Sequence, residues 1–186
     1  MRFIHHLLGP VEQQRLTSWL FIRLLALVYF AAFLSLAGQL PGLVGPQGIL
    51  PLQEQFDGAH GDLGRGAWLW LPTLFWLVEP TDAALQGTAL LGAVLSLVLL
   101  ITARGQRLML ALLFLLYLSL YHAGQIFTNF QWDALLLEAG LLAILLGKVP
   151  ARLVVLLYEW LLFRLRFMSG FFNWPATTRP GPASPP

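Results

Sequence analysis

The stretch AALQGTALLGAVLSLVLLITA, from Ala83 to Ala103, contains no charged residue. A second uncharged stretch, LMLALLFLLYLSLYHAGQIFTNFQW, follows at Leu108–Trp132. Runs of about 18 or more apolar residues with few charges are typical of helices that cross a membrane. Only helices and closed barrels satisfy their backbone hydrogen bonds inside lipid. The two runs therefore predict an integral membrane protein built from helices.

The composition of the whole chain agrees with this prediction. Of its 186 residues, 58% are hydrophobic and 11% are charged, with a mean hydropathy of +0.71. Soluble domains contain about 25% charged residues. The net charge of +2 is not concentrated in a basic cluster, so nucleic-acid binding is not predicted. The chain has no cysteine, which excludes disulfides, thiolate catalysis and cysteine metal sites.

The apolar runs and the breaks between them predict an all-α, multipass membrane helical bundle of about five transmembrane helices. After the first of them, Gly42–Gly66 is rich in glycine and acidic residues and predicts a long flexible loop. The next 12 residues, AWLWLPTLFWLV (Ala67–Val78), would span only about 18 Å as a helix. They contain Pro72 and predict a short re-entrant or interfacial aromatic helix. The five predicted spans are Ser18–Leu40, Ala83–Ala103, Arg107–Tyr121, Phe130–Gly147 and Ala151–Met168.

Two regions follow from this organisation. Residues 1–170 are expected to form the transmembrane domain. Residues 171–186, which include NWPATTRPGPASPP, are rich in proline and are expected to be a disordered tail.

Positive and negative residues separate onto the two predicted sides of the membrane. Arginine and lysine dominate the N-terminal lead and the turns at Ala103–Arg107 and Gly147–Arg152. Acidic residues dominate the connection from Gly42 to Asp82. Since cytoplasmic loops carry the excess of positive charge, the N-terminus is predicted to be cytoplasmic. The long loop and the C-terminus are then outside or luminal. The membrane is expected to be the inner membrane in a bacterium and the endoplasmic reticulum in a eukaryote.

Two carboxylates, Asp133 and Glu138, interrupt the fourth predicted span. Asp133 lies in its first turn, and Glu138 lies about 10 Å from the point near Gln131 where the span begins. The fifth span returns antiparallel after a turn centred near residues 149–150, which brings Arg166 level with Asp133. Arg164 falls within one helical turn of Glu138. Because arginine can bind a carboxylate with two hydrogen bonds, we predict that these four residues tie the two spans together as ion pairs.

Simpler interpretations of these charges stay open. The helix dipole alone can stabilise Asp133, and Arg166 can extend to the outer interface. Glu159 lies near mid-membrane without a partner in this hairpin, and Arg23 on the first span could reach toward it. Ionisable groups at such depth are candidates for function. For His122, at the outer end of the third span, a structural role is favoured over that of a ligand.

Small residues recur every four positions along the second span. This spacing places them on one helix face, where another helix can approach closely. Chance in a span rich in alanine and glycine is the alternative. The residues of this predicted packing face are Ala84, Thr88, Gly92 and Ser96.

Motifs of known enzymes are mostly absent. The chain has no Gly-x-Ser-x-Gly, no phosphate-binding loop with its lysine and no His-Glu-x-x-His. Three residues of the loop, Asp57, His60 and Asp62, could in principle bind a metal ion, but such groups in a flexible loop are usually only solvated. No cofactor, metal site or catalytic residue is therefore predicted.

Three blocks together resemble the lipase maturation factor family, in order and spacing. They are FIRLLALVYFAAFLSLAGQLPGLVGPQGILP (Phe21–Pro51), NFQWDALLLEAGLLAILLG (Asn129–Gly147) and EWLLFRLRFMSG (Glu159–Gly170). The resemblance implies a multipass membrane protein with a cytosolic N-terminus. In animals, such proteins reside in the endoplasmic reticulum and help secreted homodimeric lipases to fold and assemble. A client lipase, the lipid bilayer and a second copy of the chain are the expected partners.

Two features depart from the family pattern. Arg166 stands where the family usually has an apolar residue, which puts the Asp133–Arg166 pair in doubt as a device of the family. The family continues beyond the third block into a large non-cytoplasmic half, whereas this sequence continues with only the tail from Phe171. The chain is therefore expected to represent the membrane half alone, as a fragment, a frameshifted product or a truncated relative. The composition suggests a bacterial relative.

Three functional hypotheses follow. A membrane-embedded folding or assembly factor, which is not an enzyme, is favoured by the resemblance. A membrane enzyme acting on lipid-like or peptide substrates is the alternative, since distantly similar multipass domains occur in carboxylases. Its candidate residues are Glu138, Glu159 and His122. A transport subunit is the third, and Glu159 is its only indication.

Overall fold

The computed structural model describes residues 11–102, 104–146 and 151–172, and over these residues every regular element is helical. The all-α prediction is thus confirmed. The chain divides into two units, residues 1–146 and residues 147–186, which are described separately. The described residues of the second unit form one helix, α8 (Ala151–Phe172). The first contains the long helices α2 (Val11–Val44), α5 (Asp82–Ile101), α6 (Gln106–Ala123) and α7 (Gln131–Leu145).

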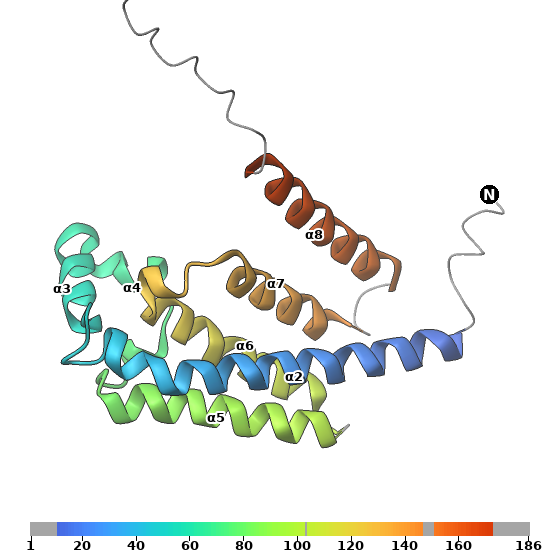
Figure 1. Ribbon diagram of the computed structural model, residues 1–186, viewed down its shortest axis with the longest axis horizontal. Coiled ribbons are helices and arrows are strands. Elements are labelled where there is room, and N and C mark those ends of the chain that lie inside the picture. Colours follow the sequence, from blue (N-terminus) through green and yellow to red (C-terminus); the bar gives the residue numbers. More distant parts are fainter. Residues whose placement is uncertain (1–10, 103, 147–150, 173–186) are drawn as a thin grey trace, which may run out of the picture. The chain divides into compact units, whose positions relative to one another are not determined.

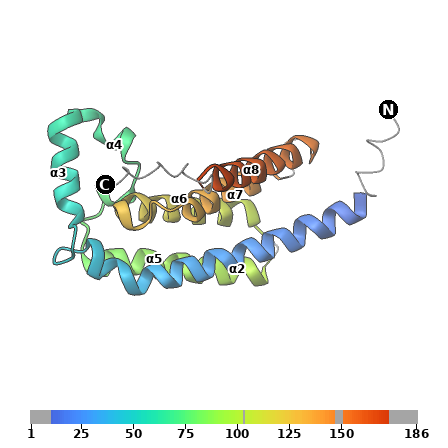
Figure 2. The same cartoon turned by 45° about the horizontal axis from the view of Figure 1, so that its top comes forward.

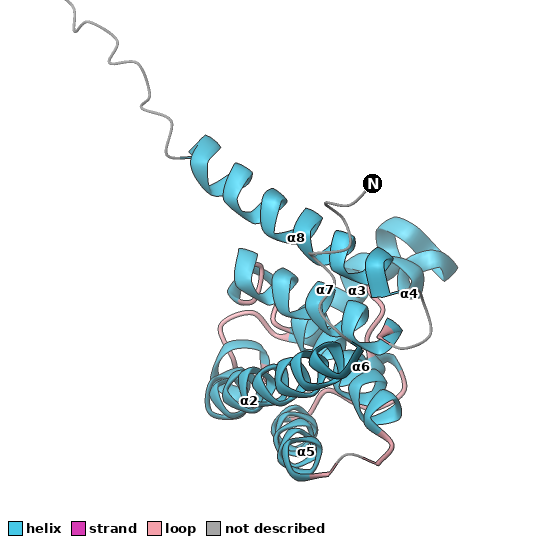
Figure 3. Ribbon diagram, turned by 90° about the vertical axis from the view of Figure 1, so that its right-hand side faces the viewer, coloured by secondary structure: helices cyan, strands magenta, loops and turns pink. Residues whose placement is uncertain are grey.

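The helices of the first unit pack as an antiparallel bundle. The contact between α2 and α5 is the most extensive, and α6 lies against both α5 and α7 (Figure 1). Figure 3 looks nearly along α2 and α5 and shows them side by side. Their fully buried side chains include Phe33 and Leu40 on α2 and Leu85 and Leu99 on α5. On the outer face of α2, Leu24, Leu27 and Val28 are about half exposed, as expected for side chains that face lipid.

Three described helices are long and apolar enough to cross a membrane. They are the Leu16–Val44 part of α2, α5 and α6. Together with the composition, they establish an integral membrane protein. The helix α7, at 15 residues, spans about 22 Å, less than the ~30 Å hydrocarbon core. In α8, two arginines and a glutamate fall between Leu153 and Gly170. Both helices therefore stay predicted rather than demonstrated spans, and the C-terminal tail lies outside the described residues.

The structure corrects the predicted end of the first helix. The helix continues through Pro41 to Val44, although proline lacks the N–H that an interior position normally donates. Leu40 and Val44, on either side of it, are completely buried. Packing of this last turn therefore outweighs the lost hydrogen bond. At 34 residues, α2 is about 51 Å long, and Figure 1 shows its N-terminal part extending beyond α5.

The predicted long flexible loop was also wrong in part. Residues Leu52–Leu63 form a 12-residue helix, α3, followed by a 3-10 turn at Gly64–Gly66. Leu52 and Phe56, one turn apart on α3, are buried and fix it to the bundle. Figure 2 shows α3 lying across the end of α2. We call this end of the bundle, where α2 ends and α5 begins, the α3 end.

The aromatic segment Ala67–Val78 is not a single helix. It forms a four-residue helix, α4 (Ala67–Trp70), and a 3-10 turn, η2 (Leu74–Trp76), separated at Pro72. Proline removes a hydrogen-bond donor and disfavours the helical conformation of the preceding residue, which explains the break. Trp68, Trp70 and Leu77 remain 59%, 71% and 85% exposed, so the segment presents aromatic and apolar side chains outward.

Candidate functional site

A cluster of aromatic rings occupies the centre of the bundle. Tyr29 and Phe33 on α2 stack with ring centroids 6.0 Å apart. Tyr117 on α6 meets both rings edge-on, at 5.7 Å and 5.4 Å. All three side chains are at most 2% exposed. Such edge-to-face contacts contribute stability beyond burial alone, so this cluster fixes α2 against α6.

Asp133 joins this cluster from the first turn of α7. The Tyr117 hydroxyl donates a hydrogen bond of 2.5 Å to Asp133 Oδ1, and Asp133 is only 8% exposed. The Tyr29 hydroxyl donates to the carbonyl oxygen of Leu136 at 3.2 Å. We call Tyr29, Phe33, Tyr117 and Asp133 the aromatic–aspartate cluster. Its polar atoms bind α2 and α6 to the beginning of α7 where water does not reach them.

Two glycines give the rings their room. A Cβ atom at Gly92 of α5 would lie 2.4 Å from the Phe33 ring. A Cβ atom at Gly140 of α7 would meet the Tyr29 hydroxyl. Close approach of a ring to a helix backbone is possible only where no side chain intervenes. The two glycines are therefore required by the position of the cluster.

The hydrogen bond between Tyr117 and Asp133 gives a first prediction. The substitution Tyr117→Phe should lower the free energy of unfolding by about 2 kcal/mol, because it leaves a buried carboxyl group without its donor. Asp133→Asn keeps an acceptor for the hydroxyl and should cost less than Asp133→Ala. The measurement is unfolding of the purified chain in mixed micelles. The control is Tyr121→Phe, because the Tyr121 hydroxyl donates to the exposed Asn129. If Tyr117→Phe lowers the free energy of unfolding no more than Tyr121→Phe does, the prediction is contradicted.

Arg23 has its partners at the opposite end of the bundle. Its Nη1 donates hydrogen bonds to the carbonyl oxygens of Leu99 and, at 3.1 Å, Thr102, where α5 ends. Its guanidinium also lies 5.4 Å from the centre of the Trp19 ring. The last carbonyls of a helix have no partners within it and carry partial negative charge. Arg23 thus caps α5 from a neighbouring helix, which accounts for a buried arginine at this depth.

A second prediction concerns this cap. Arg23→Gln should lower the free energy of unfolding by about 2 kcal/mol, since it removes a charged donor from buried carbonyls. Arg23→Lys should recover only part of this loss, because a lysine cannot present the same planar set of donors. Arg107→Gln, an exposed arginine at the same end, is the control and should change the free energy by less than about 0.5 kcal/mol. Equal losses for Arg23→Gln and Arg107→Gln would contradict the capping role.

The structure places the other predicted residues as follows. On α5, Gly92 and Ser96 are buried, and Ala84 and Thr88 are half-buried. The hydroxyls of Thr88 and Ser96 donate back to the carbonyls of Ala84 and Gly92, both at 2.7 Å. Glu138 is half-buried on α7. His122 is half-buried near the end of α6, with its ring 5.6 Å from that of Tyr121.

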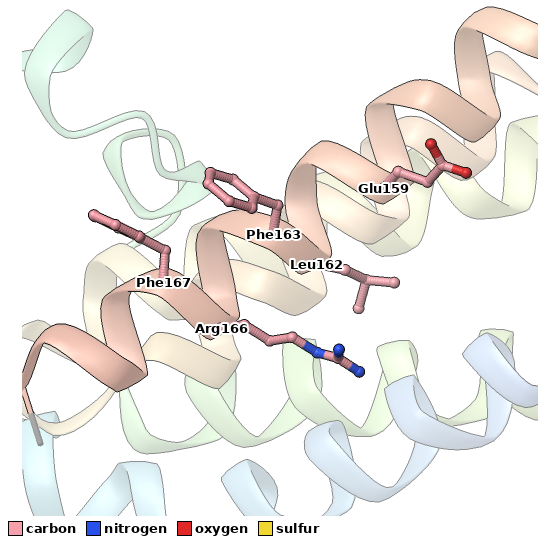
Figure 4. A pocket seen from close by; sticks show the side chains of 5 residues that line it. All are labelled: Glu159, Leu162, Phe163, Arg166 and Phe167. Atoms are coloured by element: carbon pink, nitrogen blue, oxygen red, sulfur yellow. The ribbon is translucent and has the colours of Figure 1, made fainter.

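The remaining charged candidates lie on α8, in the second unit. Glu159 and Arg166 line a shallow hollow on this helix together with Leu162, Phe163 and Phe167 (Figure 4). The rings of Phe163 and Phe167 stack at 5.8 Å. The ion pairs of Arg164 and Arg166 with α7 would join the two units and stay predictions, as does the approach of Arg23 to Glu159.

The chemistry of the cluster is that of a structural core. Tyr117 and Asp133 link α6 to α7 through one buried hydrogen bond, and among the described residues no three histidine or acidic side chains could hold a metal ion together. Sequence reasoning missed Tyr117 because it searched for charged partners of Asp133. The sequence did contain a signal for this contact. In the hairpin formed by α6 and α7, Tyr117 falls within about one helical turn of the depth of Asp133.

Comparison with known proteins gives the family. A family model described as "Lipase maturation factor transmembrane domain" matches residues 16–178. Lipase maturation factor 2 of Gallus gallus is 42% identical, over 86% of this chain and 24% of that protein. Lipase maturation factor 2 of Xenopus tropicalis is 40% identical, over 85% and 25%. Lipase maturation factor 1 of Mus musculus is 35% identical, over 89% and 32%.

The chain thus spans about a quarter to a third of the length of these relatives. No solved structure matches it. The matched region takes in all of the described spanning helices and the whole aromatic–aspartate cluster. The chain belongs to the lipase maturation factor family, within its transmembrane domain.

Proposed function

We propose that this chain acts as a membrane-embedded scaffold that assists the folding or assembly of secreted lipases. The observation that carries the proposal is the match of its transmembrane domain, over residues 16–178, to relatives that are named lipase maturation factors. The buried polar groups support a scaffold rather than an enzyme, because Tyr117, Asp133 and Arg23 hold helices together. A rigid membrane domain of this kind would position a client-binding part on one side of the membrane.

The proposal includes an orientation. The α3 end of the bundle carries Glu54, Asp57, Glu79 and Asp82, whereas Arg104 and Arg107 follow the opposite end of α5. Under the positive-inside rule, this charge distribution favours an α3 end that faces the lumen of the endoplasmic reticulum, or the periplasm in a bacterium. Secreted lipases fold on that side of the membrane.

The test is co-expression of the chain with a secreted homodimeric lipase in cells that lack their own maturation factor. The measured quantity is lipase activity per amount of secreted lipase, which separates folding from expression. We expect an increase with the parent chain and with Gly87→Ala, an exposed glycine with open space around it. A chain that is present in the membrane at normal level but leaves this ratio unchanged would refute the proposal.

The same assay addresses the enzyme alternative. Glu138→Gln and His122→Gln would abolish the increase with the folded protein intact if either group took part in catalysis. A scaffold predicts instead that the increase follows the amount of folded chain in the membrane across all variants.

A further inference from the structure

A second polar site lies at the α3 end of the bundle, apart from the aromatic–aspartate cluster. It is a pocket between α3 and the η2 segment, and we call it the α3–η2 pocket. On one side it is lined by Gln53, Phe56, Asp57 and His60 of α3, and on the other by residues Phe75–Pro80. The hydrogen bonds of the aromatic–aspartate cluster and of Arg23 do not involve its lining residues.

The walls of the pocket are fixed in place. Phe56 stacks on Trp76 with ring centroids 4.1 Å apart, and the His60 ring meets the edge of Trp76 at 5.0 Å. Trp76 Nε1 donates to the carbonyl of Leu71 at 2.8 Å. A site whose side chains are held by packing and hydrogen bonds loses little entropy when a ligand binds.

The position of the pocket along the membrane normal follows from the attachment of η2 to α6. Thr73 Oγ1 donates to the Ser119 carbonyl at 3.2 Å, and the Leu74 N–H donates to Ser119 Oγ at 3.1 Å. Ser119 lies about 6 Å before Ala123, the last residue of α6. On the other side, α5 begins at Asp82, directly after the pocket lining. The pocket therefore sits where the spanning helices leave the hydrocarbon core.

The lining has two chemically distinct parts. Asp57 and Glu79 are exposed carboxylates, and no lysine or arginine is among the lining residues. With the half-buried ring of Trp76 beside them, they favour a cation, and a quaternary ammonium in particular. The opposite lip consists of Leu77 and Val78, which are 85% and 55% exposed. A ligand that fits both parts is cationic at one end and apolar at the other.

The surroundings identify where such a ligand comes from. Trp68, Leu69 and Trp70 of α4, earlier in the same segment, are 59–71% exposed. Tryptophans with this exposure are typical of the membrane–water interface, where their amphipathic rings lie among lipid head groups. These exposures favour a position at the head-group layer of one leaflet for the aromatic segment, whose later part forms one wall of the pocket.

We propose that the α3–η2 pocket binds the ammonium head group of a zwitterionic phospholipid in the leaflet at the α3 end. Asp57 and Glu79 hold the choline or ethanolamine group, and the acyl chains run along Leu77 and Val78. A lipid held there would fasten α3 and the aromatic segment to the membrane surface. This binding is independent of the proposed function.

The test uses the full chain, purified in detergent and mixed with equal amounts of phosphatidylcholine and phosphatidylglycerol. Lipids retained on the intact protein are counted by native mass spectrometry. We expect phosphatidylcholine to be retained preferentially, and Asp57→Asn/Glu79→Gln to weaken its binding about fivefold or more. The matched control is Glu54→Gln/Asp62→Asn, which makes the same charge change on exposed residues of α3 outside the pocket.

Three outcomes would overturn the proposal: equal retention of both lipids by the parent chain, equal losses in the two double variants, or no loss in either. A third variant, Leu77→Asn, changes only the exposed lip and should weaken lipid retention while leaving the binding of soluble phosphocholine as it was. Preferential binding of a lysine-rich peptide, with no selectivity among lipids, would assign the pocket to a protein partner instead. Thermal unfolding of each variant confirms that the fold is kept.

Discussion

Gly92→Ala should destabilise the bundle by about 3 kcal/mol, at the upper end of the usual cost of overpacking. The added Cβ would lie 2.4 Å from the Phe33 ring, which is completely buried, stacks on Tyr29 and meets Tyr117 edge-on. Either this buried ring must shift against its neighbours or α2 and α5 must separate, and both cost packing energy. This interface is the most extensive helix contact of the chain. The measurement is unfolding of the purified chain in mixed micelles, supported by the yield of folded protein.

The matched control is Gly87→Ala on the same helix. A Cβ at Gly87 would meet nothing within 4 Å, and the position is exposed. Because alanine is the better helix former, this change should be neutral or stabilising by up to about 1 kcal/mol. If the two substitutions had equal effects, helix propensity rather than close packing would govern α5. A second change, Phe33→Leu, should restore part of the stability lost in Gly92→Ala, since it removes the obstructing ring edge.

The spans α5 and α6 were predictable because each is defined by the hydropathy of a long uninterrupted stretch of sequence. The uncharged run at Ala83–Ala103 corresponds to α5 within two residues at its C-terminal end. Arg107–Tyr121 corresponds to α6, which begins one residue earlier and ends two later. Hydropathy over about 20 residues and charged residues at the ends decide such helices, and neither depends on tertiary contacts.

The errors occurred where tertiary packing decides. The pattern at Pro41 indicates a helix end, but burial of Val44 extends α2 by one more turn. The glycines of α3 indicate a loop, yet Leu52 and Phe56 recur at helical spacing and hold the helix to the bundle. That spacing was a readable signal in the sequence, and the glycine content obscured it.

The partner of Asp133 illustrates the same limit at the site. Register in the hairpin of the last two predicted spans pointed to Arg166, whereas the described partner is Tyr117 on the preceding helix. An uncharged tyrosine gives no signal in a search for opposite charges, although it is a good donor for a buried carboxylate. The substitution Arg166→Gln distinguishes between Arg166 and Tyr117 as the main partner of Asp133. With Tyr117 as the main partner, this change should alter stability by less than about 0.5 kcal/mol.

For the deeper carboxylate the expectation is different, and the effect is larger. If the predicted ion pair between Glu138 and Arg164 forms within the membrane, Glu138→Gln or Arg164→Gln alone should lower the free energy of unfolding by about 3 kcal/mol or more, because either change would leave one buried charge without its counterpart. The double variant should recover much of this loss, since a pair of neutral amides can hydrogen-bond to each other. Unfolding in mixed micelles of the parent, both single variants and the double variant gives the coupling free energy directly.

The control for this cycle is Glu138→Gln combined with Arg166→Gln. Arg166 is two residues from Arg164 and therefore lies on a different side of α8. The combination should therefore show no recovery of stability. If stability is recovered only when Glu138→Gln is combined with Arg164→Gln, and not with Arg166→Gln, Glu138 is assigned to an ion pair that joins the two units of the chain. Full stability of Glu138→Gln would remove the structural explanation for a carboxylate about 10 Å inside the helix, and Glu138 would then be the first residue to test for proton or substrate chemistry.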